Sequence, residues 1–366
     1  MWRQKVVGAS YRHLIKPLLF RFDPEAVHDR TIALGRRLGA SRFARATARW
    51  VVGAAPSPLL DQERAGLTFP TPIGLAGGFD KNAELVPWLG VLGFGFAEVG
   101  SITAEPCVGN PKPRLWRLPE SKSLQVNYGL KNDGVTVIAE RLRRALATAS
   151  NTMRVGTNIA VTNTGAIGSL DEAIEDYAVS FARLADLGDY FTINISCPNR
   201  LGYDLFWEPL HCRALLERLQ VISTRKPLFL KLSPDMTEAQ TAALAELALE
   251  RKLAGLIVSN LTRSGVPAAR QQPGGVSGGL VQTSADRQLC FLARQVPREF
   301  TLIGCGGVFS AADAYRKIGL GASLVQVVTG LVYQGPQLAA QIASELPALL
   351  VRDGFMDLAS AVGHML

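Results

Sequence analysis

The sequence predicts an α/β fold in which a (β/α)8 barrel of the TIM class follows a small N-terminal helical domain. Eight short β-rich runs alternate with helical patterns between residues 72 and 328, and this alternation implies parallel strands joined by helices. The 366 residues, 48% of them hydrophobic, suffice for one large barrel core. The first 50 residues are strongly basic, so we expect them to form a separate unit.

Two helices are predicted in the N-terminal domain. Residues 23–25, Asp-Pro-Glu, combine an N-cap, a proline at the first helical position and an early acid, which indicates a helix from there to about Leu38. A second helix is predicted over residues 41–52. Residues 53–58, Gly-Ala-Ala-Pro-Ser-Pro, have the composition of a linker, so we place a boundary near residue 60. The predicted domains are residues 1–60 and residues 61–366.

The barrel strands are predicted from the eight β-rich runs, with helices between them. A doubly wound open sheet is the alternative, but it needs a GxGxxG turn after the first strand, and the glycines of residues 74–78 do not have that spacing. The clearest helical patterns lie at residues 170–187, 208–221 and 237–250. The predicted strands are residues 72–76, 96–100, 155–160, 191–196, 228–233, 255–259, 302–305 and 323–328.

Composition argues against several classes of protein. No run approaches eighteen consecutive apolar residues, and the first ten residues lack the apolar region of a signal peptide, so we expect neither a spanning helix nor export. The five cysteines are widely spaced and odd in number, which indicates reduced thiols. With four histidines and no CxxC or HExxH motif, no metal site is expected.

The positive charge is concentrated at the N-terminus. Residues 1–50 hold eleven Lys and Arg against three acids, which accounts for the whole net charge of +8. The same segment is rich in Trp, Phe and Leu. Basic amphipathic helices of this kind are typical of a protein that lies on an anionic membrane surface, so we expect a peripheral protein on the cytoplasmic side. A solvated helical face is the alternative, whereas nucleic-acid binding has no fold signal here.

Candidate site residues follow the strands, because active sites of this barrel are built at the carboxyl ends of its strands. Residues 194–199, Asn-Ile-Ser-Cys-Pro-Asn, offer amides that suit a flat heterocycle and a thiol, Cys197, that can accept a proton. Lys81 could hold a carboxylate or phosphate, and Lys231 lies inside an apolar run, where a lysine is rarely buried without a partner. A satisfied polar turn with a structural cysteine is the alternative for residues 194–199.

Glycine-rich turns follow the seventh and eighth runs. Residues 304–307 read Gly-Cys-Gly-Gly, and Gly330 follows the last run. In this barrel such turns are the usual phosphate grip, because they offer backbone N–H donors to a dianion. We therefore expect a bound phosphorylated cofactor.

Taken together, these motifs resemble dihydroorotate dehydrogenases in order and spacing. The motifs that carry the resemblance are Gly-Gly-Phe-Asp-Lys at 77–81, residues 194–199, Leu-Lys-Leu at 230–232, Gly-Val-Ser-Gly at 275–278 and residues 304–307. The segments Asp-Pro-Glu-Ala-Val-His at 23–28 and Gly-Asn-Pro-Lys-Pro-Arg at 109–114 look like the membrane-associated, quinone-using class 2 enzymes.

The resemblance implies an FMN-dependent enzyme that oxidises dihydroorotate to orotate and passes electrons to a membrane quinone. It makes Cys197 the catalytic base and places His28 and Arg117 in the quinone site. A solvent-facing helix histidine is the alternative for His28. The implied substrate-binding residues are Lys81, Asn194, Asn199, Asn260 and, if its loop shifts by one residue, Asn127. The implied cofactor-binding residues are Gly77, Gly78, Lys81, Ser101, Asn158, Asn194, Lys231, Ser259, Gly278, Gly307, Val328 and Thr329.

The chain also departs from the family pattern. Class 2 enzymes usually have Ser where this chain has Cys197, which is the class 1 residue. Val126 stands at the position of a substrate-binding Asn, Leu261 at that of a Thr, and Val328 at that of a Tyr. Apolar residues there would leave an orotate amide unpaired. A divergent FMN oxidoreductase acting on another cyclic compound is therefore the first alternative, and a non-catalytic flavin-binding regulator on membranes is the second.

Overall fold

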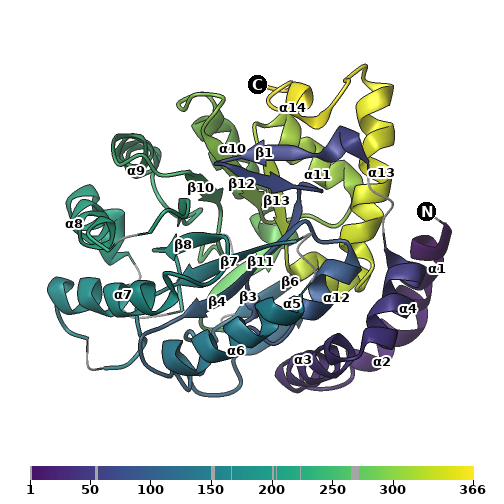
Figure 1. The fold of residues 1–366 in the computed structure, drawn as a ribbon, viewed down its shortest axis with the longest axis horizontal. Coiled ribbons are helices and arrows are strands. Elements are labelled where there is room, and N and C mark those ends of the chain that lie inside the picture. Colours follow the sequence, from purple (N-terminus) through teal and green to yellow (C-terminus); the bar gives the residue numbers. More distant parts are fainter. Residues whose placement is uncertain are drawn as a thin grey trace.

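The computed structural model confirms the predicted barrel (Figure 1). It describes residues 2–53, 57–149, 153–165, 167–199, 202, 204–222, 224–264 and 272–366. Eight parallel strands close in the order β10-β12-β13-β3-β4-β7-β8-β9. Each begins within one residue of its predicted start, although β3 runs further than predicted. The strands are β3 (Ile73–Asp80), β4 (Phe96–Ile102), β7 (Arg154–Ile159), β8 (Tyr190–Asn194), β9 (Leu228–Lys231), β10 (Gly255–Val258), β12 (Thr301–Cys305) and β13 (Leu324–Val327).

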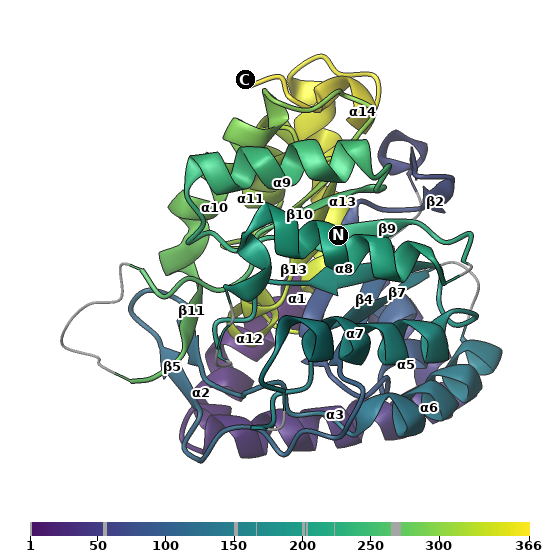
Figure 2. The same cartoon turned by 90° about the vertical axis from the view of Figure 1, so that its left-hand side faces the viewer.

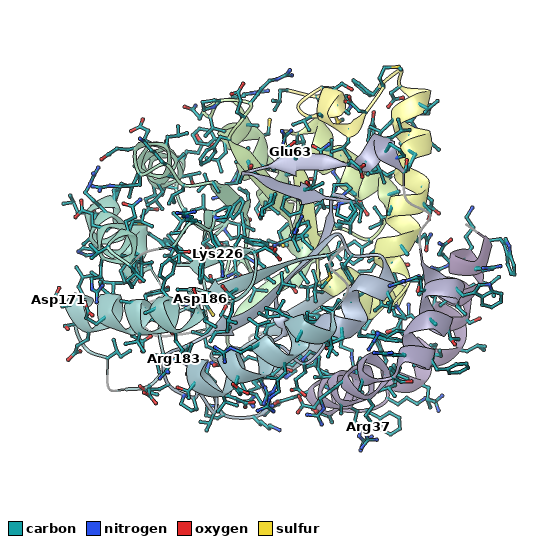
Figure 3. All side chains as sticks on the ribbon, viewed as in Figure 1. Arg37, Glu63, Asp171, Arg183, Asp186 and Lys226 are labelled. Carbon is teal, nitrogen blue, oxygen red and sulfur yellow. The ribbon has the colours of Figure 1, made fainter. Side chains whose placement is uncertain are left out.

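Helices surround the strands and bury their apolar faces against them. Capping boxes begin two of these helices, with Ser169 and Glu172 at α7 and Thr237 and Gln240 at α9. Charged side chains such as Asp171 cover the outer faces (Figure 3). The helices are α5 (Val86–Leu89), α6 (Gly134–Thr148), α7 (Leu170–Leu184), α8 (Pro209–Gln220), α9 (Glu238–Glu250), α10 (Gln282–Ala293), α11 (Ala311–Gly319), α12 (Thr329–Gln334), α13 (Leu338–Arg352) and α14 (Leu358–Ala361), with short 3-10 turns at Pro58–Leu60, Gly90–Leu92, Leu205–Trp207 and Gly279–Val281.

The amino ends of the strands are closed by an apolar plug. A hairpin of β1 (Gln62–Arg64) and β2 (Leu67–Phe69) places Phe69 against Phe96, with ring centres 5.5 Å apart. These two rings belong to a buried cluster drawn from several strands. Because this end is filled, the carboxyl ends of the strands are left for chemistry.

Two features cover the carboxyl ends. The first is a three-stranded antiparallel sheet, β5 (Leu115–Leu118), β6 (Ser123–Val126) and β11 (Gly275–Gly278), in the order β11-β6-β5 (Figure 2). The second is the N-terminal helical segment, which lies beside the barrel (Figure 1). Its elements are α1 (Trp2–Ser10), a π-helical turn (Tyr11–Ile15), α2 (Lys16–Leu19), α3 (Pro24–Ala40) and α4 (Arg42–Val52).

The two helices predicted in the N-terminal segment begin within one residue of their predicted starts. The Asp23 side chain accepts a hydrogen bond from the Ala26 amide at 2.8 Å, so α3 begins at Pro24 as expected, and it ends two residues later than predicted. Ser41 caps α4. Residues 54–56 of the predicted linker lie outside the described residues. Within the described chain, no helix is long and apolar enough to cross a membrane.

Candidate active site

A cavity of about 490 Å³ lies at the carboxyl ends of the strands and continues to α2 and α3. Most of the predicted site residues line it, which brings together segments from nearly every strand end. Asn127 and Asn158 are not among its lining residues. The predicted residues that line it are His28, Gly77, Gly78, Lys81, Ser101, Arg117, Asn194, Cys197, Asn199, Lys231, Ser259, Asn260, Gly278, Gly307, Val328 and Thr329.

Asn194 organises the polar wall of the cavity. Its Nδ2 donates to Ser101 Oγ at 2.9 Å, and Ser101 Oγ in turn donates to Asn158 Oδ1 at 2.5 Å. Asn158 therefore does not face the cavity itself but holds the Ser101 hydroxyl, which does. Asn260 Nδ2 donates to Asn194 Oδ1 at 3.3 Å and to Ser196 Oγ at 3.0 Å. These bonds join four strand ends, those of β4, β7, β8 and β10, and fix the amides before any ligand binds.

A buried carboxylate, Glu98, lies beneath this wall and was not expected from the sequence. It is 0% exposed and lies 4.0 Å from the Lys231 ammonium, measured from Oε2 to Nζ. Lys231 is itself buried and lines the cavity. The partner that a buried lysine needs is therefore present, next to a lysine that lines the cavity.

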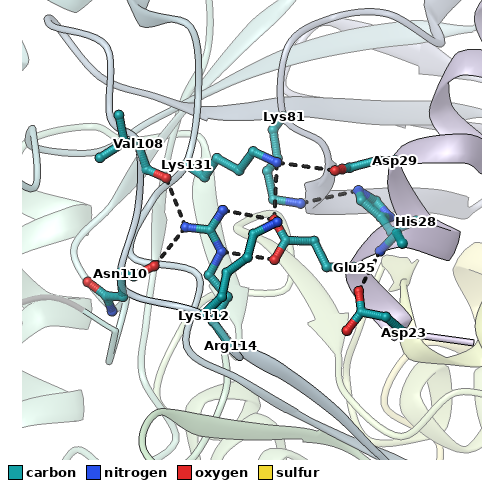
Figure 4. Close-up of polar contacts among 11 residues, drawn as sticks. Asp23, Glu25, His28, Asp29, Lys81, Val108, Asn110, Lys112, Arg114 and Lys131 are labelled. Carbon is teal, nitrogen blue, oxygen red and sulfur yellow. Dashed lines mark hydrogen bonds and ion pairs between the residues drawn. The ribbon is translucent and has the colours of Figure 1, made fainter.

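Lys81 and His28 form a second polar pair where the barrel meets α3 (Figure 4). Lys81 Nζ lies 3.3 Å from His28 Nε2 and 4.2 Å from the centre of the Tyr128 ring. Burial lowers the pKa of Lys81 to about 8. Burial and the neighbouring Lys81 hold the pKa of His28 well below its usual range, so the imidazole is neutral and can accept a hydrogen bond from the lysine.

The nearby acid on α3, Glu25, is occupied by other cations. Its Oε2 accepts from Arg114 Nε at 3.0 Å, and its Oε1 accepts from Arg114 at 2.8 Å and Lys131 at 3.1 Å (Figure 4). Against the effect of burial, these hydrogen bonds lower the pKa of Glu25 to about 2. Lys81 thus has a neutral histidine and an aromatic ring as near neighbours, which leaves its charge for an anion in the cavity.

The donors and glycines of the cavity fit a flavin. Among the described residues, the buried atoms Ser259 Oγ and Gln326 Oε1 have no hydrogen-bond partner, although both residues line the cavity. Gly278 and Gly307 have φ of +90° and +72°, and a Cβ at Gly278 would collide with the Lys122 carbonyl. Orphaned polar atoms beside glycine turns suit a flat heterocycle with a phosphate.

The region predicted to bind substrate is less polar than the family pattern. Val126 and Leu261 line the cavity. Asn127 does not take the place of Val126, because its Oδ1 accepts from Asn110 Nδ2 at 2.9 Å and its backbone N–H donates to the Arg114 carbonyl at 2.8 Å. The one-residue loop shift that Asn127 would need is thus not observed. Cys197, which follows β8, is half-buried at the cavity wall.

The outer part of the cavity lies between the N-terminal segment and the barrel. Arg117 Nη1 donates to the Phe22 carbonyl at 2.8 Å, and its guanidinium lies 4.6 Å from the centre of the Phe20 ring. Tyr11 donates to the Val332 carbonyl at 2.9 Å. Arg117 therefore holds the turn between α2 and α3 over the cavity.

Comparison with known proteins decides the family. A family model described as dihydroorotate dehydrogenase matches residues 59–350. The chain belongs to the dihydroorotate dehydrogenase family. Proteins named dihydroorotate dehydrogenase (quinone) from Gloeobacter violaceus and Haloarcula marismortui are 39% and 40% identical to it, over 96% of this chain and 98% of each relative.

Solved structures of the same family share the architecture. The structure of the Eimeria tenella enzyme in complex with ferulenol has a TM-score of 0.83 and 29% identity, and the match covers 93% of this chain and 95% of that one. The ligand-free enzyme from the same organism has a TM-score of 0.78 and 30% identity. The barrel and its N-terminal helices are thus a family architecture.

Proposed function

We propose that this protein oxidises dihydroorotate to orotate and passes the electrons through FMN to a quinone. The observation that carries the proposal is that one continuous cavity has Lys81, Cys197 and Lys231 lining its barrel end and the N-terminal helices lining its other end. The relatives named dihydroorotate dehydrogenase (quinone) support the same substrate and acceptor.

Each side chain has a role in this reaction. Lys81 binds the substrate carboxylate, and the amides of Asn194, Asn199 and Asn260 bind the ring. The Cys197 thiolate removes a proton from the carbon adjacent to the one that gives up hydride. When bound, FMN supplies the two-electron acceptor for that hydride. Lys231 stabilises the negative charge that develops beside it.

The cofactor assignment follows from the glycine turns. Gly278, Gly307 and Thr329 hold the monophosphate, while Ser101, Ser259 and the backbone of residues 77–78 meet the ring system. Asn158 acts on the ring indirectly, through its hydrogen bond with Ser101. Val328 forms an apolar wall.

The N-terminal segment supplies the acceptor side and the membrane contact. Residues 1–60 form this unit in our proposal, with His28 and Arg117 beside the quinone path. Large apolar side chains point outward from its helices, among them Leu14 at 71% and Phe43 at 82% exposure. With the basic residues around them, they suit an anionic membrane surface on the cytoplasmic side.

Anaerobic reduction of the flavin tests the proposal. The purified protein should contain FMN, bleach on addition of dihydroorotate and regain its colour on addition of a quinone. A Lys81→Met variant should stay yellow and bleach far more slowly at the same substrate concentration. A colourless protein that takes up no FMN would contradict the flavin site.

A divergent substrate is the second candidate function, and the apolar lining at Val126 and Leu261 favours it. A substrate amide that faces these side chains would be left unpaired, at a cost of about 1 to 3 kcal/mol. If the yellow protein bleaches with another cyclic dihydro acid and not with dihydroorotate, this second function is correct. Efficient bleaching by dihydroorotate excludes it.

A further inference from the structure

Glu98 is a buried carboxylate at the centre of the barrel, and the proposed reaction leaves it without a role. Its Oε2 accepts hydrogen bonds from the Gly77 amide at 3.2 Å and from Asn158 Nδ2 at 2.8 Å. Its Oε1 accepts from Thr192 Oγ1 at 2.9 Å and from Gln326 Nε2 at 2.7 Å. Donors from four strands satisfy an ionised carboxylate, whereas a protonated one would direct its own O–H at a donor.

Lys231 is the cation that pairs with this carboxylate. Its side chain is 4% exposed, it ends β9, and its Nζ lies 4.0 Å from Glu98 Oε2. At that distance the two groups attract by charge without a hydrogen bond, so the N–H donors of Lys231 stay available to the cavity. Burial disfavours a charged lysine, and the charge of Glu98 opposes that penalty.

Other titratable groups around the pair do not replace Glu98 as the counter-charge. Burial raises the pKa of Cys305 on β12 and holds the pKa of Tyr190 on β8 well above its usual range, so both are neutral near pH 7. Lys317 on α11 acts on Cys305 from behind and is itself a cation. Lys81 and Cys197 line the same cavity from other strand ends.

We propose that Glu98 is a positioning residue for Lys231. Its fixed charge keeps the lysine protonated at the barrel mouth, where the ammonium can stabilise negative charge on a flavin ring. This inference rests on the proposed flavin site and adds a residue that touches neither substrate nor cofactor through its carboxylate. It explains why so many strands direct donors at one acid.

Sulfite binding to the flavin-loaded protein tests the proposal. Sulfite adds its electron pair to oxidised flavin and leaves negative charge on the ring. In Glu98→Gln, Lys231 loses its counter-charge and gives up its proton more readily. The sulfite dissociation constant of this variant, divided by the wild-type value, should rise about tenfold or more between about pH 6.5 and about pH 9.5. A ratio that stays constant would overturn the proposal.

Two variants separate charge from structure. Adding Lys231→Arg to Glu98→Gln should abolish the rise, because arginine stays charged. Thr192→Val removes one hydrogen bond to Glu98 but no charge, so its ratio should not vary with pH. A rise of the same size in Thr192→Val would show that loosened packing is the cause and would contradict the proposal.

Lys231→Met supplies an independent arm should Glu98→Gln fail to fold. Wild type should bind sulfite more tightly than Lys231→Met by the same factor at both ends of the pH range. A factor that falls to one at the higher pH would show that the lysine is not held in its charged form. Colourless protein throughout would defeat the flavin site itself, and the inference with it.

Discussion

At the scale of single residues, Cys197 is the candidate base, and its replacement gives a direct prediction. Cys197→Ala should slow flavin reduction by dihydroorotate about 10²- to 10⁴-fold, the usual contribution of a positioned base, while FMN stays bound. Because the thiolate is the active form, the wild-type rate should rise with pH, and Cys197→Ser should move that rise to higher pH. Stopped-flow reduction across pH measures both. An alanine variant that bleaches at the wild-type rate would exclude Cys197 as the base.

Lys81 gives a prediction with the opposite pH dependence. Burial lowers its pKa to about 8, so the ammonium that binds a carboxylate is present below about pH 8 and is lost above it. The dissociation constant of the product orotate should therefore rise about tenfold per pH unit above that value. Ionisation of the Cys197 thiol or of the orotate ring would act equally on a variant with a permanent cation, so the effect of Lys81 is the difference between that variant and wild type.

A Lys81→Arg variant is the matched control for this titration. Arginine remains charged over the whole range, so its orotate affinity should fall less than that of wild type above about pH 8. The change in flavin absorbance on orotate binding reports both constants. Wild-type affinity that is constant from about pH 7 to about pH 10 would contradict the assignment of Lys81 to the carboxylate.

The sequence predicted the site residues that line the cavity at the strand ends, but it did not predict the residues inside the barrel that position them. Cys197, Lys81 and Lys231 could be proposed because a barrel places strand ends together. Glu98 could not, because the role of one acid in the apolar run of β4 depends on partners from five other strands, which the sequence alone does not bring together. The contact between Lys81 and His28 likewise joins residues 53 positions apart.

At the scale of elements, the ion pairs of Glu25 hold α3 against the loops of the barrel. Glu25 is 3% exposed and Arg114 is 5% exposed, so removing one charge leaves the other buried. Glu25→Gln should destabilise the docking of α3 by about 3 kcal/mol, and amide hydrogen exchange in residues 24–40 should quicken more than in the barrel strands. Glu63→Gln, at an exposed acid on β1 (Figure 3), is the control and should leave exchange unchanged.

The same docking should weaken in acid. The folded pKa of Glu25, about 2, lies below its ordinary value of 4.5, so its contribution is complete above about pH 4.5 and is lost as the pH falls towards 2. Exchange in α3 should therefore quicken over that window in wild type and change less in Glu25→Gln. Equal exchange in both proteins at neutral pH would contradict the role of this ion pair.

The elements also show where local pattern suffices for prediction. The barrel strands and helices α7, α8 and α9 were predictable because each has a local signal: β-rich runs mark the strands, capping boxes mark α7 and α9, and a proline begins α8. The sheet of β5, β6 and β11 was not predicted, since β11 reads Gly-Val-Ser-Gly and pairs with a strand about 150 residues earlier. No local signal specifies such a pairing.

At the scale of the whole molecule, the polar chemistry lies at one end of the cavity, and among the described residues the exposed Trp and Phe side chains lie in the N-terminal segment. A surface that only faces water does not need apolar side chains of this size, yet Trp2 is 70% exposed and Trp50 is 66% exposed. The whole net charge of the chain lies in the same segment. In the proposed function, this arrangement lets an acceptor dissolved in a membrane reach the flavin site from the apolar phase.

Vesicle binding tests this arrangement. Full-length protein should sediment with vesicles that contain anionic lipid and bind less to neutral ones, because the basic residues add to apolar insertion. The double change Leu14→Ser and Phe43→Ser should weaken binding at least about tenfold, since each large apolar side chain contributes about 1.5 kcal/mol or more when it leaves water. Leu210→Ser is the matched control, because Leu210 is 70% exposed but lies on α8 of the barrel. If both variants bind as wild type does, or if both lose binding equally, the N-terminal helices are not the membrane face.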